Sequence, residues 1–401
     1  MNRIFKAAII GGGSAGLLCA AELLSGENRL KGEDVVILER SDRVGKKLIA
    51  TGNGQGNLTN AFISAENYSG DPTFIRAFIE QLKFVDLTEY LKNLGIITET
   101  DESGRIYPVS RQANSVLDIL RAYLSGTNCT VITGFKANKI TETNGVFTVS
   151  AENGEKIKAE NVVLAAGGKA AKQFGTDGQG YSLATAFGHK LTPLFPSLVQ
   201  LKTEKAPIKG LKGIKSNATV ALFDGNAFIK QASGDLLFTD YGVSGNTVFK
   251  ISDKTVTLKN PVIKIDFLPQ FTEKELLEIL TKRTRNGFMS KTDILNGLVH
   301  KKLGETIVKL SGGELERTIK TVKSFAIKVT GTLGFDYAQT TKGGIDTDDI
   351  DRNGYESKLQ KGLYITGEML DVDGECGGYN LTFAFVSGIV AARSIKNKFK
   401  N

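Results

Sequence analysis

The chain opens with a short apolar stretch that runs directly into a cluster of glycines, and this stretch most constrains the fold. Residues 6–17 read KAAIIGGGSAGL, which places Gly11, Gly13 and Gly16 in the spacing G-x-G-x-x-G. In a strand–turn–helix unit the first glycine permits a tight turn, the second lets the backbone approach a pyrophosphate, and the third lets the helix pack closely on the strand. The spacing predicts a dinucleotide site, with the first amides of the helix facing the phosphates.

The sequence around the glycines decides whether this motif is meaningful, because three glycines alone are weak evidence. Residues 17–24 are rich in alanine and leucine and predict a helix, and residues 34–38 predict a second buried strand. Glu39 follows that strand, 23 residues after Gly16. This is close to the distance at which an acid accepts hydrogen bonds from a ribose hydroxyl. Together these features favour a ligand site over a ligand-free turn.

Composition limits the class of protein. The chain has 401 residues, 41% of them hydrophobic, which is enough for two or three domains with a large core. No apolar run approaches the roughly 20 residues that cross a bilayer, so we expect no membrane partner. Three widely spaced cysteines indicate neither a disulfide framework nor a zinc or other metal cluster, which favours a cytoplasmic protein.

The formal charge of +8 raises the question of a polyanionic partner. The lysines and arginines are spread along the chain, their densest groups are short, and no RNA- or DNA-binding motif accompanies them. This pattern favours a solvated basic surface over a nucleic-acid site.

The order of predicted elements indicates a discontinuous first domain with an insertion. Strands predicted at 130–133, 135–141, 146–150 and 156–164 are joined by the turn signals Asn144-Gly145 and Asn153-Gly154. Helices are predicted over 72–95 and near 113–125. We assign 1–190 and 338–401 to the dinucleotide domain.

Residues 191–270 and 324–337 are expected to form an inserted, barrel-like β domain, with strands at 198–201, 218–223, 226–231, 262–266 and 324–330. A helical lobe over 271–323 opens with Thr272 and Glu275 in the spacing of a capping box. His189 invites a catalytic interpretation, but its place at the far end of a predicted helix favours capping or packing. His300, in a predicted helical stretch, has no partner pattern.

A second signature lies near the C-terminus. Residues 362–388 read GLYITGEMLDVDGECGGYNLTFAFVSG, in which a strand ends at Gly367-Glu368 and a helix begins at GGYN, residues 377–380. Flavoproteins commonly have an acid at the end of such a strand, where Glu368 stands here, in contact with the ribityl hydroxyls. The helix would direct its positive N-terminal end at the pyrimidine edge of a flavin, where negative charge accumulates on reduction.

The segment 40–60, RSDRVGKKLIATGNGQGNLTN, resembles the GKK…SGGGRCN-T-N stretch of the HI0933-like or bile-acid dehydro-reductase type of NAD(P)/FAD-dependent oxidoreductases. Residues 104–112 and the stretch 175–189 also resemble that family, and the latter is similar to fumarate reductase flavoproteins. Gln55 and Gly56 stand where the family pattern usually has Arg and Cys. No role for that arginine or thiol is therefore carried over.

The resemblance implies an α/β, Rossmann-like FAD-binding fold of the glutathione-reductase/fumarate-reductase flavoprotein type, with an inserted β-barrel-like domain carrying a small helical lobe. It also implies noncovalent FAD, a transient NADH or NADPH reductant, and hydride transfer from reduced FAD to the C=C bond of an enone-type small-molecule substrate. Two alternatives stay open: an RNA-modifying flavoprotein resembling the glucose-inhibited division family, and a non-catalytic flavin-dependent interaction module. The oligomeric state stays open as well.

The residues expected to bind FAD come from the glycine turn, the acid after the second strand, the basic loop, the strands near 137 and 166, the helix start near 177, and the C-terminal signature. They are Gly11, Gly13, Ser14, Ala15, Gly16, Glu39, Arg40, Lys46, Lys47, Thr51, Gly52, Asn57, Thr59, Ala137, Ala166, Gly167, Gly168, Asp177, Gly178, Gly367, Glu368, Gly378, Tyr379, Asn380 and Leu381. No catalytic acid is assigned; Tyr379 and Cys376 are weak candidates.

Overall fold

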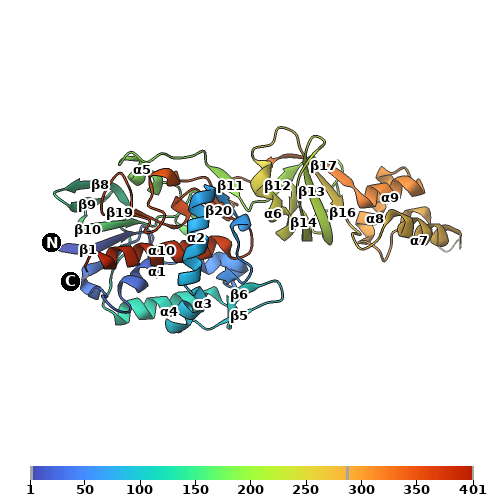
Figure 1. Cartoon of the computed structure of the whole chain (residues 1–401). Helices are drawn as coiled ribbons and strands as arrows, with labels where there is room; N and C mark the ends of the chain where they lie inside the picture. Colours follow the sequence, from blue (N-terminus) through green and yellow to red (C-terminus); the bar gives the residue numbers. More distant parts are fainter. Residues whose placement is uncertain (1–2, 286–288, 400–401) are drawn as a thin grey trace. The chain divides into compact units, whose positions relative to one another are not determined.

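The computed structural model describes residues 3–285 and 289–399 (Figure 1). Two compact units make up the chain: Met1–Leu194 with Thr340–Asn401, and Phe195–Gln339. The first unit is therefore built from two segments that are far apart in the sequence. The second unit is an insertion between them.

A seven-stranded sheet forms the centre of the first unit, in the order β7-β2-β1-β10-β9-β8, with β19 also paired to β10. The strands that pair in parallel, β7, β2, β1, β10 and β19, confirm the Rossmann-like prediction. Every residue of β2 is buried, as expected for a parallel strand covered on both faces. The bounds are β1 Ile4–Ile10, β2 Val35–Leu38, β7 Thr130–Ile132, β8 Ala137–Thr143, β9 Val146–Ala151, β10 Lys156–Leu164 and β19 Leu363–Ile365.

Two helices from opposite ends of the chain, α1 Ser14–Leu23 and α10 Tyr379–Asn397, lie side by side against this sheet (Figure 1). Their contact depends on Gly388, because a Cβ there would lie 2.2 Å from the Ala15 carbonyl oxygen. The N-terminal glycine turn is thereby held next to the C-terminal segment.

The remaining elements of the first unit are short or lie around this pair. The helices are α2 Pro72–Phe84, α3 Leu87–Asn93, α4 Ala113–Gly126 and α5 Gly180–Thr185; the strands are β3 Thr59–Asn60, β4 Tyr68–Gly70, β5 Thr98–Thr100, β6 Arg105–Pro108, β18 Thr340–Lys342 and β20 Val372–Gly374. A single helix over 72–95 was wrong, because the Asp86 carboxylate accepts a hydrogen bond from Glu89 N (3.0 Å) and begins a new helix.

The second unit contains a closed barrel in the order β12-β15-β14-β13-β16-β17. Three helices, α7, α8 and α9, are inserted in the sequence between β16 and β17. This confirms the β-barrel insert with a helical lobe. The bounds are β11 Phe195–Ser197, β12 Leu201–Thr203, β13 Lys215–Asp224, β14 Ala227–Phe238, β15 Gly242–Ser244, β16 Pro261–Asp266, β17 Phe325–Thr332, α6 Asn246–Thr255, α7 Glu273–Arg285, α8 Lys301–Leu310 and α9 Leu315–Lys323. The capping box is present: Thr272 N and Glu275 N each bond the other residue's side chain.

Three details of this unit differ from the prediction. The strand expected at 198–201 is wrong: residues 198–200 lie between β11 and β12, and only Leu201 belongs to a strand, because Leu198 adopts a left-handed φ of 51° that an extended strand does not allow. Helix α6 lies where only strands were expected. His300 precedes α8 as its N-terminal flanking residue rather than lying within a helix.

Among the described residues, no helix is long and apolar enough to cross a bilayer. Over the same ranges, no group of three or more histidine, cysteine, aspartate and glutamate side chains is placed to hold a metal ion.

The α1–α10 contact yields a stability prediction. Gly388→Ala should lower the free energy of unfolding by about 1–3 kcal/mol, because its Cβ meets backbone that cannot move aside. Gly126→Ala is the matched control, since nothing lies within 4 Å of a Cβ built there. Urea unfolding followed by circular dichroism measures both, and equal stability of the two variants would contradict the close packing.

His189 is buried, and its Nε2 lies 2.8 Å from Ser357 Oγ, which supports the packing role. Burial lowers the pKa of the imidazole from its ordinary 6.5, and the charge of Asp349 only partly opposes this. The unfolded chain therefore binds a proton more readily than the folded one. The stability contributed by neutral His189 is full above about pH 6.5 and is lost as the pH falls through that value.

We expect His189→Gln to flatten the decline in unfolding free energy between about pH 8 and about pH 5.5. His300→Gln is the control, because that side chain is exposed and should leave the decline unchanged. Denaturant unfolding at the two pH values measures the difference. A decline of the same size in both variants would assign the pH dependence to other groups.

Candidate functional site

The three glycines of the turn have different surroundings, which match the three roles expected of them. A Cβ at Gly11, where φ is +105°, would lie 2.4 Å from Ala165 O, and a Cβ at Gly16 would lie 2.0 Å from Gly11 O. Gly13 has nothing within 4 Å of such a Cβ. The first and third glycines are thus needed for packing, and the second faces space through which a pyrophosphate can approach. Ser14 and Ala15 begin α1 directly behind it.

Glu39 is held in position by two backbone amides. Its Oε2 accepts a hydrogen bond from Gly12 N (2.8 Å) and its Oε1 accepts one from Ser41 N (2.7 Å). An ionised carboxylate has about four acceptor positions, so each oxygen retains one for a ribose hydroxyl. Phe135 N also bonds Glu39 O (2.9 Å), which places Ala137, the first residue of β8, near the same end of the sheet.

Arg40 and Asp177, expected separately to face the cofactor, form an ion pair of 2.6 Å. Partial burial alone would raise the pKa of the Asp177 carboxyl. The hydrogen bonds from Arg40 and from Gln179 N lower it by more than this, so the pKa lies below the ordinary value. Gly178, with φ of +84°, follows in the turn that leads into α5. This pair joins the segment after β2 to the segment before α5.

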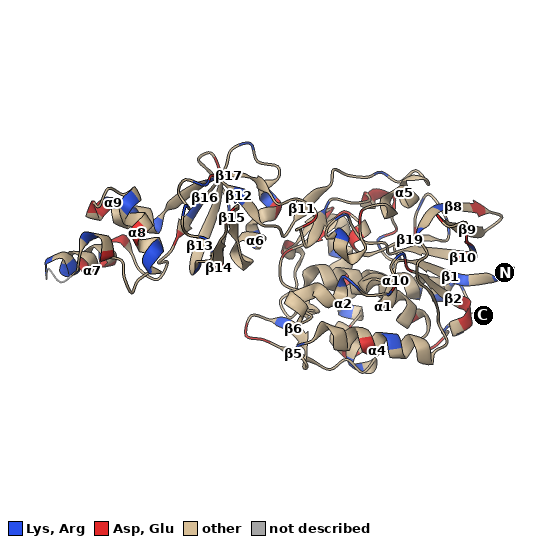
Figure 2. Cartoon of the chain, turned by 180° about the vertical axis from the view of Figure 1, so that it is seen from behind, with Lys and Arg blue, Asp and Glu red and all other residues tan. Residues whose placement is uncertain are grey.

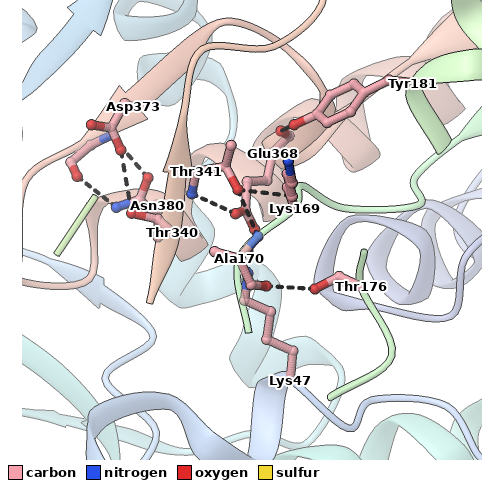
Figure 3. A network of polar contacts seen from close by, with 11 residues as sticks. Lys47, Lys169, Ala170, Thr176, Tyr181, Thr340, Thr341, Glu368, Asp373 and Asn380 are labelled. Atoms are coloured by element: carbon pink, nitrogen blue, oxygen red, sulfur yellow. Dashed lines mark hydrogen bonds and ion pairs between the residues drawn. The ribbon is translucent and has the colours of Figure 1, made fainter. Parts of the chain in front are cut away.

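A network around Glu368 connects three distant parts of the chain (Figure 3). Lys47 Nζ lies 2.6 Å from Glu368 Oε2, and Thr341 N donates to Glu368 Oε1 (2.9 Å). The Thr341 hydroxyl in turn accepts hydrogen bonds from Lys169 N (2.8 Å) and Ala170 N (2.9 Å). The Glu368 carboxylate is therefore fixed by the basic loop and by β18 at once.

Glycines bring backbone close to this network. A Cβ at Gly168 would lie 2.6 Å from Glu368 Oε1, and one at Gly367 would lie 3.0 Å from the Ala15 side chain. The segment Ala166–Gly167–Gly168 after β10 and the Gly367–Glu368 turn thus both lie beside the start of α1. Two segments expected to bind one dinucleotide are indeed adjacent in the fold.

The two lysines of the basic loop differ. Lys47 contacts Glu368, whereas Lys46 pairs with the exposed carboxylate of Asp42. Farther along the loop, Thr51 Oγ1 donates to Leu48 O (2.7 Å) and Gly52 adopts a left-handed φ of 56°. Only one of the two lysines is directed into the network.

The start of α10 is braced by the end of the basic loop. Gly378, with φ of +98°, precedes the helix, and a Cβ there would lie 2.6 Å from Thr59 O. In the orientation that satisfies the Asn57 amide, its oxygen accepts from Gly378 N (3.1 Å) and its nitrogen donates to Thr59 O (3.0 Å). Thr382 Oγ1 donates to Thr59 Oγ1 (2.7 Å). The helix N-terminus is fixed by side chains from the other end of the chain.

The remaining C-terminal candidates lie in the first turn of α10, except Cys376, which precedes the helix. The Asn380 side-chain amide accepts a hydrogen bond from Gly374 N (2.9 Å) and donates one to Gly374 O (2.6 Å), so it holds the preceding loop. Leu381 is half-buried. Tyr379 is 9% exposed, and burial followed by the charge of Glu375 raises the pKa of its hydroxyl. Cys376 is half-buried.

Thr341 is the residue of the network that sequence reasoning missed. It lies in the stretch TTKGG, residues 340–344, whose small residues indicate a close approach of backbone but not its partner. The amides of Lys169 and Ala170 were missed for the same reason, because backbone groups carry no sequence pattern.

The comparisons with known proteins identify the family. A model described as the HI0933-like protein Rossmann domain matches residues 5–394. The chain belongs to this HI0933-like family. It is a member of a family of FAD-dependent oxidoreductases, and the glycine turn and helix N-termini described above fit that cofactor.

Two curated relatives span this HI0933-like chain almost completely. It is 36% identical to a 3-dehydro-bile acid delta(4,6)-reductase of Clostridium scindens, over 98% of the chain and 99% of the relative. It is 28% identical to a ribosomal RNA dihydrouridine synthase of Haemophilus influenzae, over 99% of the chain and 100% of the relative.

Solved structures share the fold. Quinol fumarate reductase FrdA of E. coli aligns with a TM-score of 0.51 at 16% identity, covering 99% of this HI0933-like chain and 70% of that one. A 3-ketosteroid-delta4-(5alpha)-dehydrogenase from Rhodococcus jostii RHA1 aligns with a TM-score of 0.51 at 14% identity, over 98% and 97% of the two chains. At this identity the likeness establishes the fold alone.

The contrast between two glycines gives a prediction for FAD binding. Gly13→Ala should fold normally, because its Cβ meets nothing, yet weaken FAD binding about tenfold or more by obstructing the pyrophosphate. Gly16→Ala should instead lower the stability of the apoprotein. Isothermal titration of apoprotein with FAD, together with thermal unfolding, separates the two effects. If Gly13→Ala bound FAD with native affinity, the assignment of the pyrophosphate to this turn would be wrong.

Proposed function

We propose that this FAD-dependent oxidoreductase reduces a C=C bond conjugated to a carbonyl group, with NADH or NADPH as the transient reductant. The observation that carries the proposal is the full-length relative named for delta(4,6) reduction of a 3-dehydro bile acid. In such a substrate the carbonyl makes the β-carbon electrophilic. The two-electron balance is one hydride to the β-carbon, one proton to the α-carbon, and oxidation of one NADH or NADPH.

Bound FAD would supply the hydride, and the residues of the chain have three tasks around it. The turn at Gly13 and the α1 N-terminus hold the pyrophosphate, and Glu39 accepts from the ribose. The pair of Lys47 and Glu368 orients the ribityl chain. The α10 N-terminus stabilises the negative charge that develops on the pyrimidine edge.

The proton for the α-carbon needs a donor that is protonated at neutral pH. We propose Tyr379 for this task by its position as the first residue of α10, the helix assigned here to the pyrimidine edge of the flavin, because a phenol keeps its proton at neutral pH. Cys376 is the second candidate by its position three residues before Tyr379, where α10 begins.

A second acceptor of the same chemistry is a uracil base in RNA. The C=C bond of uracil is also conjugated to a carbonyl, and two full-length relatives are named ribosomal RNA dihydrouridine synthases, at 28% and 26% identity. The small molecule and the uracil thus require the same hydride addition and differ in how the acceptor is bound. A flavin-dependent interaction module without turnover is the alternative that an anaerobic titration excludes or supports.

The test is an anaerobic titration of the yellow holoprotein with NADH and with NADPH, monitored by the visible absorption of the flavin. Bleaching by one nucleotide, followed by reoxidation with a conjugated enone but not with its saturated ketone, is the expected result. Bleaching by dithionite alone would contradict the nicotinamide-dependent reductase and favour the non-catalytic module.

Neighbouring lysines provide a matched pair of variants whose affinity for FAD can be measured by isothermal titration of the apoprotein. Lys47→Met should weaken FAD binding about tenfold, because it leaves the carboxylate of Glu368 without its cation in a largely buried position. Lys46→Met should bind FAD as the native protein does, since Lys46 pairs with exposed Asp42. Equal behaviour of the two variants would exclude Lys47 from the site.

A further inference from the structure

The net charge of the protein belongs entirely to the inserted unit. Residues 195–339 contain 22 lysines and arginines and 14 aspartates and glutamates, a net charge of +8. The first unit contains 29 of each and is formally neutral. Blue residues mark the barrel and the helices α7–α9 in Figure 2. The division comes mainly from lysine: the inserted unit has 19 of the 38 lysines in little more than a third of the chain, whereas the acids have a similar density in both units.

One segment of the inserted unit presents lysines at a fixed interval. Residues 208–215 read IKGLKGIK, a three-residue repeat of an apolar residue, a lysine and a glycine. The apolar members, Ile208, Leu211 and Ile214, are buried in the core of the unit. Each is followed by an exposed lysine, and we call Lys209, Lys212 and Lys215 the lysine strip.

Successive turns fix the backbone of the lysine strip. Leu211 N donates to Ile208 O, and Ile214 N donates to Leu211 O, both at 3.0 Å. The glycines between them, Gly210 and Gly213, have φ of +87° and +85°, which is the conformation that the third position of a type II turn requires. Gly213 N also bonds Phe238 O (2.9 Å), which attaches the strip to β14. The three lysines therefore project from a backbone that is already ordered.

Few acids oppose the strip. Lys212 Nζ lies 3.0 Å from Asp240, and both side chains are largely exposed, so the pair contributes little. Glu204 is the one acid between residues 201 and 223, and it accepts a hydrogen bond from Lys328 N. Among the described residues, Lys209 and Lys215 have no ion pair. Two further exposed lysines, at 202 and 205, precede the strip.

The residues of the lysine strip favour one class of polyanionic partner, a phosphate polymer, over a membrane surface. Evenly spaced point charges suit a polymer with evenly spaced phosphates, and lysine contacts phosphate without reading sequence. A membrane surface would require apolar side chains directed outward, whereas the apolar members of this repeat are all buried. The strip contains no aromatic residue for stacking on bases.

We propose that the lysine strip docks the phosphodiester backbone of RNA and so delivers an RNA substrate to this enzyme. The proposal rests on the RNA acceptor put forward under the proposed function, and it concerns binding rather than reduction. The strip supplies affinity without sequence specificity, and recognition of the reacting base belongs to the flavin site.

The experiment measures fluorescence anisotropy of a labelled single-stranded RNA of about 20 nucleotides, mixed with the oxidised holoprotein over a range of salt concentrations and without reductant. The test variant carries Lys209→Gln, Lys212→Gln and Lys215→Gln. The control carries Lys139→Gln, Lys156→Gln and Lys158→Gln, three exposed lysines of the first unit, so both variants remove the same charge.

The strip variant should bind RNA at least tenfold more weakly. The slope of its log affinity against log salt concentration should be smaller in magnitude by about 2, because each of the three lost phosphate contacts contributes about 0.7 to that slope. The control should stay within about twofold of the native protein by the same relation. Flavin content and reduction of a small enone should be native in both variants, which separates a failure of docking from a failure of the reductase. Equal weakening in both variants, no RNA binding by the native protein, or binding to anionic vesicles instead of RNA would overturn the proposal.

Discussion

The contact between α1 and α10 is the constraint on which the first unit depends. It exists because Gly388 lets one helix backbone approach Ala15 of the other at the point where the glycine turn becomes a helix. With that contact in place, Gly367 lies against Ala15, and Glu368 comes within reach of Lys47. Positive helix ends, a tight glycine turn and a fixed carboxylate are thus consequences of one close packing of two helices.

The sequence was sufficient to predict the fold and the family, because the relevant patterns are local. Strand, glycine turn and helix follow one another at the N-terminus, and the capping box at Thr272 is complete within four residues. The hydrogen bonds that the backbone amides of residues 169 and 170 donate to the Thr341 hydroxyl, and the pairing of Lys47 with Glu368, could not be predicted in this way. They join residues that only the tertiary fold brings together. The split near Leu198 was also missed, since a left-handed leucine has no sequence pattern.

The proposed chemistry explains how one scaffold can serve relatives with such different substrates. A dienone of a steroid-like acid and a uracil ring share a C=C bond polarised by a carbonyl, so the flavin environment need not change between them. What must change is the surface that brings the acceptor to it. Under the proposals made above, the neutral first unit would hold the flavin and the basic inserted unit would bind the acceptor; the lysine strip lies wholly in the second unit.

The pairing of Lys47 with Glu368 also has a consequence for the order in which the protein matures. Lys47 is translated early, but its partner is made more than 300 residues later, as is β19, which completes the pairing of β10. The inserted barrel has its own buried core and can form while the remainder is still being synthesised. If FAD binds where we propose, a nascent chain has no complete site for it until translation has passed α10, and FAD binding is then one of the last events of its biogenesis.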